Sequence, residues 1–140
     1  MKILLAVDGS DYTKRMLAYL AAHDEWLGNR HDYTVLNTVA PVPARAASVI
    51  DRDTLKSYYA DTSEAVFKSI RTFFKKQGIA ATYVGKVGHA AEVIAKTADA
   101  GDFDLLVMGS HGHGTLGNLV MGSVATKVLS ACKTPVLLIR

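Results

Sequence analysis

The stretch LLVMGSHGHGTLGNLVMGSVA, residues 105–125, decides the fold. An apolar run ends at Gly109, a loop with five glycines between positions 109 and 122 follows, and Gly122-Ser123 precedes a segment that can be helical. Glycine lacks a Cβ and lets a ligand approach the main chain, while the first amides of a helix are unpaired donors at the positive end of its dipole. The stretch predicts a strand, an anion-binding loop and a helix, and we interpret the loop as a nucleotide phosphate site.

The same alternation of a short apolar run and a helical segment recurs along the chain. Strands are expected at 3–7, 33–39, 81–87, 104–108 and 135–139, and helices at 10–28, 55–78, 88–98 and 123–132. Short continuous apolar runs are typical of strands buried on both faces of a parallel sheet. The pattern predicts an α/β fold: an open, doubly wound, Rossmann-like sheet of five parallel strands in the order 3-2-1-4-5, with helices on both faces. Residues 40–52 are expected to be irregular, as a ligand-facing loop or a mobile connection.

Length and composition limit the class of protein. The 140 residues, 49% of them apolar, fit a single domain over 1–140. A net charge of +3, spread along the chain, does not predict a nucleic-acid partner. No run approaches the ~18 apolar residues of a membrane span. The one cysteine, Cys132, is expected to be a small core residue, and together these features predict a cytoplasmic protein.

Two loops are expected to enclose one crevice. In such sheets ligands bind beyond the carboxyl ends of the strands, where the strand order reverses. Asp8 follows the first expected strand, and Gly109 ends the fourth. The alternative interpretation is that Asp8 only caps the first helix, that Ser123 is only an N-cap, and that the glycines only form turns. We favour a ligand role for Asp8 because it coincides with the glycine loop at the same crevice.

Other phosphate-binding motifs do not fit. The chain contains no GxxxxGK[ST] sequence, which argues against a P-loop NTPase. Residues 112–117 match GxGxxG, but the acid that a dinucleotide site needs about 20 residues further on falls in an apolar segment, which excludes an NAD or FAD site. His111 and His113, with no carboxylate or cysteine ligand near them in sequence, make a weak metal pair.

A longer spacing is more specific. Gly109, two residues, Gly112, nine residues, and then Gly122-Ser123 form a pattern that resembles the nucleotide-binding signature of the universal stress protein family, in its ATP-binding branch. The Val-Asp-Gly-Ser sequence after the first strand and the C-terminal Thr-Pro-Val-Leu-Leu-Ile are also similar to that family. The resemblance extends over the whole chain and implies a single universal stress protein domain.

The resemblance implies an ATP-binding domain that uses Mg²⁺ and usually forms a homodimer. Asp8 would face the ribose and a phosphate-bound metal ion, and Thr38 would meet the adenine edge through its backbone. The remaining implied contacts are to the base from Ala6 and Val7, to the ribose and α-phosphate from Met108 and Gly109, and to the phosphates from Gly112, Gly122, Ser123 and Val124. His113 stands where many relatives carry arginine, and a mostly neutral histidine is a weaker phosphate ligand than a permanently charged guanidinium.

The favoured function is a nucleotide-dependent regulatory or stress-response dimer. The alternatives are a slow ATPase or autophosphorylating protein with Ser110 or Ser123 as acceptor, a nucleotidyl-transferring enzyme, and an interaction module that binds no nucleotide. The loop after the first strand lacks the His-x-Gly-His and Ser-Gly-Gly-x-Asp-Ser elements of the related enzymes. Val136–Ile139 is expected to be an apolar edge strand that pairs with a second copy, since such an edge invites aggregation when it is left open.

Overall fold

A computed structural model describes residues 1–114 and 119–140 of the chain. Within these residues five parallel strands form one sheet in the order β3-β2-β1-β4-β5, which confirms the predicted fold class. The central strand β1 pairs with β2 on one side and β4 on the other, so that Ala6 lies between Leu36 and Met108. The strands are β1 (Lys2–Val7), β2 (Asp32–Val39), β3 (Ala81–Val87), β4 (Leu105–Gly109) and β5 (Val136–Ile139).

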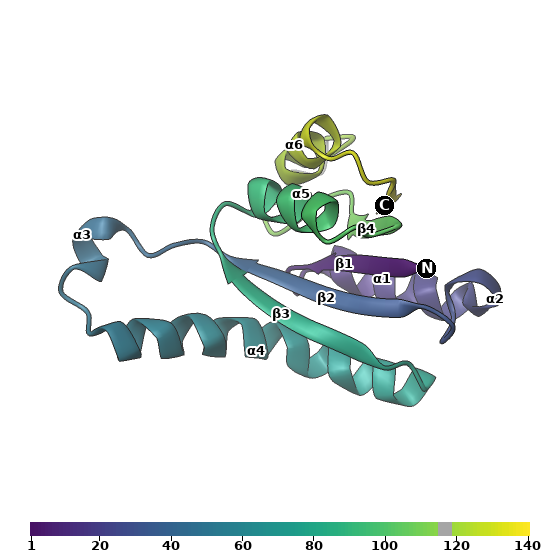
Figure 1. Ribbon diagram of the computed structural model, residues 1–140, viewed down its shortest axis with the longest axis horizontal. Coiled ribbons are helices and arrows are strands. Elements are labelled where there is room, and N and C mark those ends of the chain that lie inside the picture. The colour runs from purple at the N-terminus through teal and green to yellow at the C-terminus, as the bar shows by residue number, and fades with distance from the viewer. Residues whose placement is uncertain (115–118) are drawn as a thin grey trace.

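Helices cover both faces of the sheet. Figure 1 shows α5 and α6 on one face and α4 on the other, with α1 behind the sheet on the α4 side. None of the helices among the described residues is long and apolar enough to cross a membrane. The helices are α1 (Asp11–Ala22), α2 (Asp24–Leu27), α3 (Ala44–Ala47), α4 (Arg52–Gln77), α5 (Ala90–Ala100) and α6 (Ser123–Ala131).

Each face of the sheet has its own hydrophobic core. Alternate residues of a strand point to opposite faces, so Ile3 and Leu5 pack toward α1 and α4 while Leu4 packs toward α5 and α6. All three side chains are fully buried. A buried leucine or isoleucine stabilises a fold by about 1.5–3 kcal/mol. The continuous apolar run at the start of the chain therefore serves both cores, as a strand covered on both sides requires.

The segment predicted as one helix over 10–28 is two helices, so that prediction was wrong in extent. Helix α1 ends at Ala22, and α2 follows after His23, whose φ and ψ of −127° and 46° are not helical. The His23 ring nitrogen Nδ1 donates to the Tyr19 carbonyl at 2.9 Å, the acceptor that the His23 amide would use in a continuous helix. Side-chain competition for a backbone acceptor thus ends α1, and α2 then brings the fully buried Leu27 to the core.

Other boundaries also differ from the sequence prediction. Residues 40–52 are not wholly irregular, because Pro43 precedes the single turn α3, in which the Ala47 amide donates to the Pro43 carbonyl at 2.9 Å. Helix α4 begins at Arg52, where the Asp51 carboxylate accepts from the Thr54 amide at 3.2 Å. Strand β4 extends to Gly109. The first two differences involve a local hydrogen bond or cap, which apolar periodicity does not report.

Cys132 is less buried than expected. It is half-buried at the end of α6 and packs against the core beneath α5 and α6. Its thiol donates to the Asp99 carboxylate at 3.4 Å, and burial raises the pKa of the Cys132 thiol. The residue is thus a structural contact between α5 and the segment that leads to β5.

Candidate functional site

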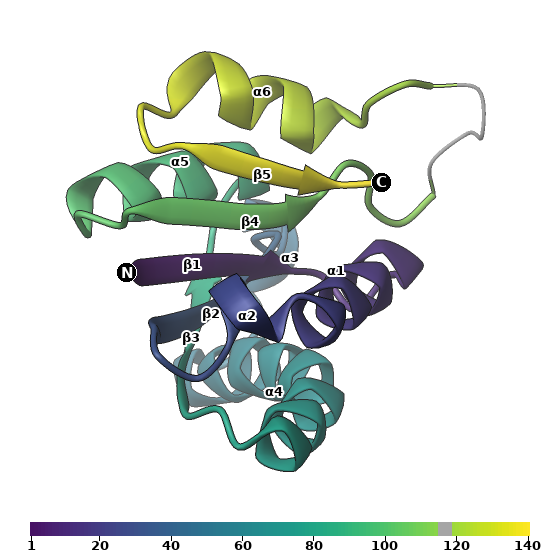
Figure 2. The same ribbon diagram turned by 90° about the vertical axis from the view of Figure 1, so that its right-hand side faces the viewer.

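A cavity of about 430 Å³ opens at the carboxyl ends of β1 and β4. Figure 2 shows β1 between β2 and β4, with the segments that follow β1 and β4 at the same end of the sheet. The volume lies in the range of about 300–1,000 Å³ that is typical of small-molecule sites. All the residues predicted for the site line this one cavity: Ala6, Val7, Asp8, Thr38, Met108, Gly109, Gly112, His113, Gly122, Ser123 and Val124.

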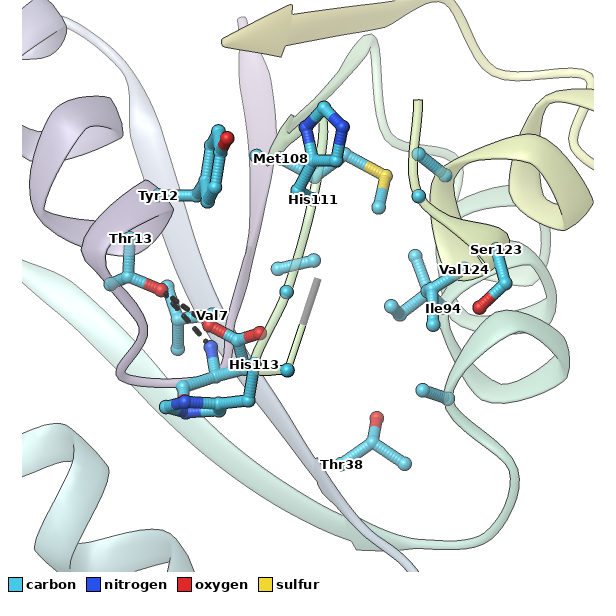
Figure 3. Close-up of a pocket in the computed structure, with 18 of the residues that line it drawn as sticks. Val7, Tyr12, Thr13, Thr38, Ile94, Met108, His111, His113, Ser123 and Val124 are labelled. Atoms are coloured by element: carbon cyan, nitrogen blue, oxygen red, sulfur yellow. Dashed lines mark hydrogen bonds between the residues drawn. The ribbon is translucent and has the colours of Figure 1, made fainter. Parts of the chain in front are cut away.

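Asp8 holds the turn between β1 and α1. Its Oδ1 accepts from the Ser10 amide at 2.9 Å. The same oxygen accepts from the Thr13 hydroxyl at 3.0 Å (Figure 3). The same hydroxyl oxygen accepts from the Asp8 amide at 3.1 Å. Oδ1 thus has a structural role in this turn, although Ser10, and not Asp8, is the N-cap residue of α1. Oδ2 faces the other loop, since a Cβ placed on Gly112 would lie only 2.8 Å from it.

Two of the site glycines are also required by the packing of the chain itself. A Cβ on Gly109 would lie 2.6 Å from the Tyr12 Cβ, because α1 packs directly against the end of β4. A Cβ on Gly122 would lie 3.2 Å from both the Ser110 carbonyl oxygen and the His111 Cα, and the Gly122 amide donates to that carbonyl at 2.7 Å. These close approaches keep bare main chain along one wall of the cavity.

The two histidines of the glycine loop bind main-chain groups and fix the loop. His111 Nε2 donates to the Leu119 carbonyl at 2.7 Å, which leaves Nδ1 to accept from the Ser110 hydroxyl at 2.8 Å. His113 Nε2 donates to the Asp8 carbonyl at 2.8 Å and so ties the loop after β4 to the loop after β1. No group of three or more histidine, cysteine, aspartate or glutamate residues able to hold a metal ion occurs among residues 1–114 and 119–140.

One end of the cavity is apolar and contains a single unusual polar group. Leu36, Ala90 and Ile94 line this end from β2 and α5. Figure 3 shows the Thr38 hydroxyl pointing into the same space. Its oxygen is buried and has no hydrogen-bond partner in the part of the chain that the structure describes. Because burying an unpaired hydroxyl costs free energy, this atom marks a position where a ligand can supply a partner.

Another wall of the cavity is formed by the first turn of α6, which lies beside Ile94 (Figure 3). Gly122 is the N-cap residue and Ser123 is the first residue of the helix, so Ser123 is not the N-cap that the alternative interpretation assumed. The first amides of a helix have no partner within it, and they lie at the positive end of its dipole. Figure 3 shows Ser123 and Val124 on this side, across the cavity from Thr13. The arrangement suits an anionic group between α6 and the β1 turn.

Sequence reasoning missed several lining residues. Leu36 was detectable, because it lies two positions before Thr38 and thus on the same face of β2. Tyr12 was not detectable, since its ring meets that of His111 at a centroid distance of 4.9 Å only after α1 has packed on β4. His111 lies within the predicted glycine loop but was considered there only as a metal ligand. The other missed residues are Thr13, Ala90, Ile94, Gly114, Leu119 and Ala125.

Comparison with known proteins identifies the family. The sequence profile described as the universal stress protein family matches residues 1–140. The chain belongs to this family. It is 33% identical over 144 residues to a Thermus aquaticus universal stress protein from the QAH/OAS sulfhydrylase 3′ region, and the match covers 99% of this chain and 97% of that protein.

Solved structures of family members share the fold. The structure of protein MJ0577 from Methanocaldococcus jannaschii superposes with a TM-score of 0.77 at 23% identity, covering 99% of this chain and 94% of that one. A universal stress protein from Archaeoglobus fulgidus in complex with dAMP gives a TM-score of 0.65 at 23% identity, covering 100% and 98% of the two chains. At this identity the likeness shows the fold.

Proposed function

We propose that this chain binds ATP with Mg²⁺ in the cavity at the ends of β1 and β4, and that nucleotide occupancy regulates a dimer. The observation that carries the proposal is the convergence of four sequence segments, which supply all the predicted site residues, on one cavity of about 430 Å³. The dAMP complex of the Archaeoglobus fulgidus relative adds support from within the family.

The apolar end of the cavity suits an adenine base. Leu36 and Ile94 offer apolar surface for the faces of the ring, and the unpaired Thr38 hydroxyl lies among them. A hydroxyl can donate to a ring nitrogen or accept from an exocyclic amino group. A base that forms a hydrogen bond with Thr38 removes the cost of the unpaired hydroxyl, so the site contains a polar group that a purine edge can satisfy.

The part of the cavity lined by the glycines suits phosphates. Gly109, Gly112 and Gly122 keep the wall free of side chains, and Ser123 presents a hydroxyl in the first turn of α6. Asp8 fits a role in holding Mg²⁺, because Oδ2 faces the glycine loop and magnesium in nucleotide sites takes one or two protein carboxylates together with phosphate oxygens. When bound, the ion would neutralise phosphate charge.

The composition of the cavity wall favours nucleotide retention over rapid turnover. Among the described lining residues Asp8 is the one carboxylate, and no lysine or arginine lines the cavity. Efficient phosphoryl transfer needs a positioned base and cations at the developing charge. We therefore propose a regulatory protein of the cytoplasm in which any hydrolysis is slow.

A dimer partner is proposed at β5. This strand is at the edge of the sheet, and Val136, Leu137 and Leu138 are partly buried within one copy. Antiparallel pairing of β5 with its twofold mate would satisfy the open edge of both strands. Sedimentation at micromolar concentration should give a dimer, and a monomer at that concentration would refute this part of the proposal.

The first experiment asks whether the protein carries or takes up nucleotide. The purified protein is denatured and the supernatant analysed for nucleotides, and stripped protein is then titrated with ATP and Mg²⁺. Bound or acquired ATP supports the proposal, whereas absence of binding after addition of ATP and Mg²⁺ favours an interaction module. Turnover of about one per second or more would favour an enzyme.

Ser123→Asp tests the position of the phosphates. The residue is exposed in the first turn of α6, where an acidic side chain is expected to stabilise the helix by about 0.3–1 kcal/mol. The same charge would repel phosphate, and we expect at least a tenfold loss of ATP affinity, about 1.4 kcal/mol. Ser57→Asp, on the exposed side of α4, is the charge-matched control. Undiminished ATP affinity in a folded Ser123→Asp protein would contradict the placement.

Ser123 is a better site for this charge than Gly122. Gly122 is buried, and a side chain there would press on Ser110 and His111. A loss of binding in a Gly122→Asp variant would therefore mix loop distortion with charge repulsion. Calorimetric titration of ATP against Ser123→Asp and Ser57→Asp compares a charge at the proposed phosphate site with the same charge on α4.

A further inference from the structure

The proposed phosphate end of the cavity has little positive charge of its own. The described residues that line the cavity include the acidic Asp8 but no lysine or arginine. The helix dipole of α6 supplies partial charge, but a triphosphate adds several full negative charges. A polyphosphate would therefore bind more tightly if a cation from outside the cavity wall contacted it.

The histidines of the loop are already engaged. Both ring nitrogens of His111 bond to protein groups, Nδ1 to the Ser110 hydroxyl at 2.8 Å and Nε2 to the Leu119 carbonyl at 2.7 Å. His113 Nε2 donates a hydrogen bond to the Asp8 carbonyl at 2.8 Å. A phosphate that recruited these nitrogens would break the bonds that hold the loop in place.

Arg15 is the cation positioned to supply the missing charge. It lies one turn after Tyr12 on α1, and its guanidinium carbon is 4.7 Å from the centroid of the Tyr12 ring. Tyr12 lines the cavity, and its Cβ is the atom that a Cβ on Gly109 would meet at 2.6 Å. The guanidinium therefore stands one side chain away from the glycine wall of the proposed phosphate site.

Arg15 is also free of carboxylate partners in the described part of the chain. The two ion pairs found there join Lys14 to Asp11 at 3.7 Å and Arg71 to Glu64. Lys14, the neighbouring cation, has Asp11 beside it, whereas Arg15 has no carboxylate partner among these pairs and rests on an aromatic ring. An exposed cation–π contact is weaker than a charge-assisted hydrogen bond to phosphate, so the guanidinium gains by moving to an anion.

We propose that Arg15 binds the outer phosphates of the nucleotide and thereby sets the preference for ATP over AMP. The inference rests on the proposed function. The guanidinium turns from the Tyr12 ring toward the β- and γ-phosphates, where its planar fork can donate two hydrogen bonds. A monophosphate carries less negative charge than a triphosphate and therefore gains less from the guanidinium.

The test measures affinities for ATP, ADP and AMP by calorimetric titration at fixed salt and Mg²⁺. Arg15→Gln is expected to weaken ATP binding about tenfold and AMP binding less than twofold, because one charge-assisted contact to phosphate is lost. Arg15→Lys keeps the charge without the fork and should give an intermediate ATP affinity. Arg30→Gln, in the exposed segment before β2 at the other end of the sheet, is the charge-matched control and should leave all three affinities unchanged.

The outcomes separate the two proposals. Equal losses for ATP and AMP in Arg15→Gln, or no loss for ATP, overturn the assignment of Arg15 while the nucleotide site stands. Wild-type protein that binds none of the three nucleotides refutes the proposed function, and the assignment of Arg15 falls with it. Thermal melting of each variant checks that the exposed substitution leaves the fold intact.

Discussion

Thr38→Val should make the protein more stable and its nucleotide binding weaker. The Thr38 hydroxyl is buried, lacks a partner among the described residues and points into the cavity (Figure 3). Valine has almost the same shape and suits a strand, so the change removes the hydroxyl while the packing of β2 is kept. Stability and affinity are thus expected to move in opposite directions, which a simple packing defect would not produce.

The magnitudes follow from the two states of the hydroxyl. An unsatisfied buried polar group costs about 1–3 kcal/mol, and we take about 1 kcal/mol because Thr38 borders a cavity. For a chain of this length the gain corresponds to a rise of roughly 3–4 °C in the melting temperature. In the complex, the loss of one hydrogen bond of about 0.5–1.5 kcal/mol lowers affinity by roughly two- to twelvefold.

Ser10→Ala is the matched control. The Ser10 hydroxyl is also buried without a partner, and although Ser10 is the N-cap residue of α1, its side chain makes no capping bond. Ser10 does not line the cavity. Thermal melting and calorimetric titration with ATP are carried out on both variants. Ser10→Ala should share the rise in stability and leave ATP affinity unchanged.

Two results would refute the reasoning. A Thr38→Val protein that is about 1 kcal/mol less stable than wild type would mean that the hydroxyl is satisfied without ligand. An unchanged ATP affinity would mean that the base does not use this group. A loss of affinity in Ser10→Ala as well would point to a general effect of the β1 turn.

The remaining predictions concern stability. The Lys133 and Thr134 amides and the Thr134 hydroxyl donate to Asp99 and hold the pKa of its carboxyl at about 2, below the ordinary 3.8. Because the folded state favours the ionised carboxylate, Asp99 stabilises the fold above about pH 4. This contribution is lost as the pH falls toward 2. Asp99→Asn, whose neutral amide accepts weaker bonds, should melt below wild type at pH 7 and converge with it near pH 2, and a constant difference would count against this. Phe74→Ala should lower the free energy of unfolding by about 3–5 kcal/mol in urea, because Phe74 is 1% exposed. Tyr58→Ala, on the exposed part of the same helix, should stay within about 0.5 kcal/mol, and similar losses for both would contradict the core assignment.

Much of the fold was predictable because it depends on local patterns. The runs at 3–7 and 105–108 are apolar at every position, which is typical of a strand covered on both faces. Gly78 ended the predicted long helix and does end α4, with a φ of 65° that glycine adopts readily. The break at His23 was not predictable, because a side-chain hydrogen bond to Tyr19 decides it.

Some features of the candidate site were likewise predictable from the sequence, and others were not. The spacing of Gly109, Gly112 and Gly122 and the position of Asp8 were visible in the sequence, and all four residues line the cavity. The engagement of His113 by the Asp8 carbonyl was not visible, since it joins two loops far apart in the chain.

The sequence by itself determined the five strands, the longer helices and where bare main chain lies, because burial periodicity and the absence of a Cβ are properties of neighbouring residues. Only the tertiary structure decided which side chains meet across those segments. Tyr12 lies against Gly109, Arg15 rests on Tyr12, and no packing of the described residues supplies a partner for the Thr38 hydroxyl. Such contacts depend on sheet register and helix packing, which no single stretch of the chain encodes.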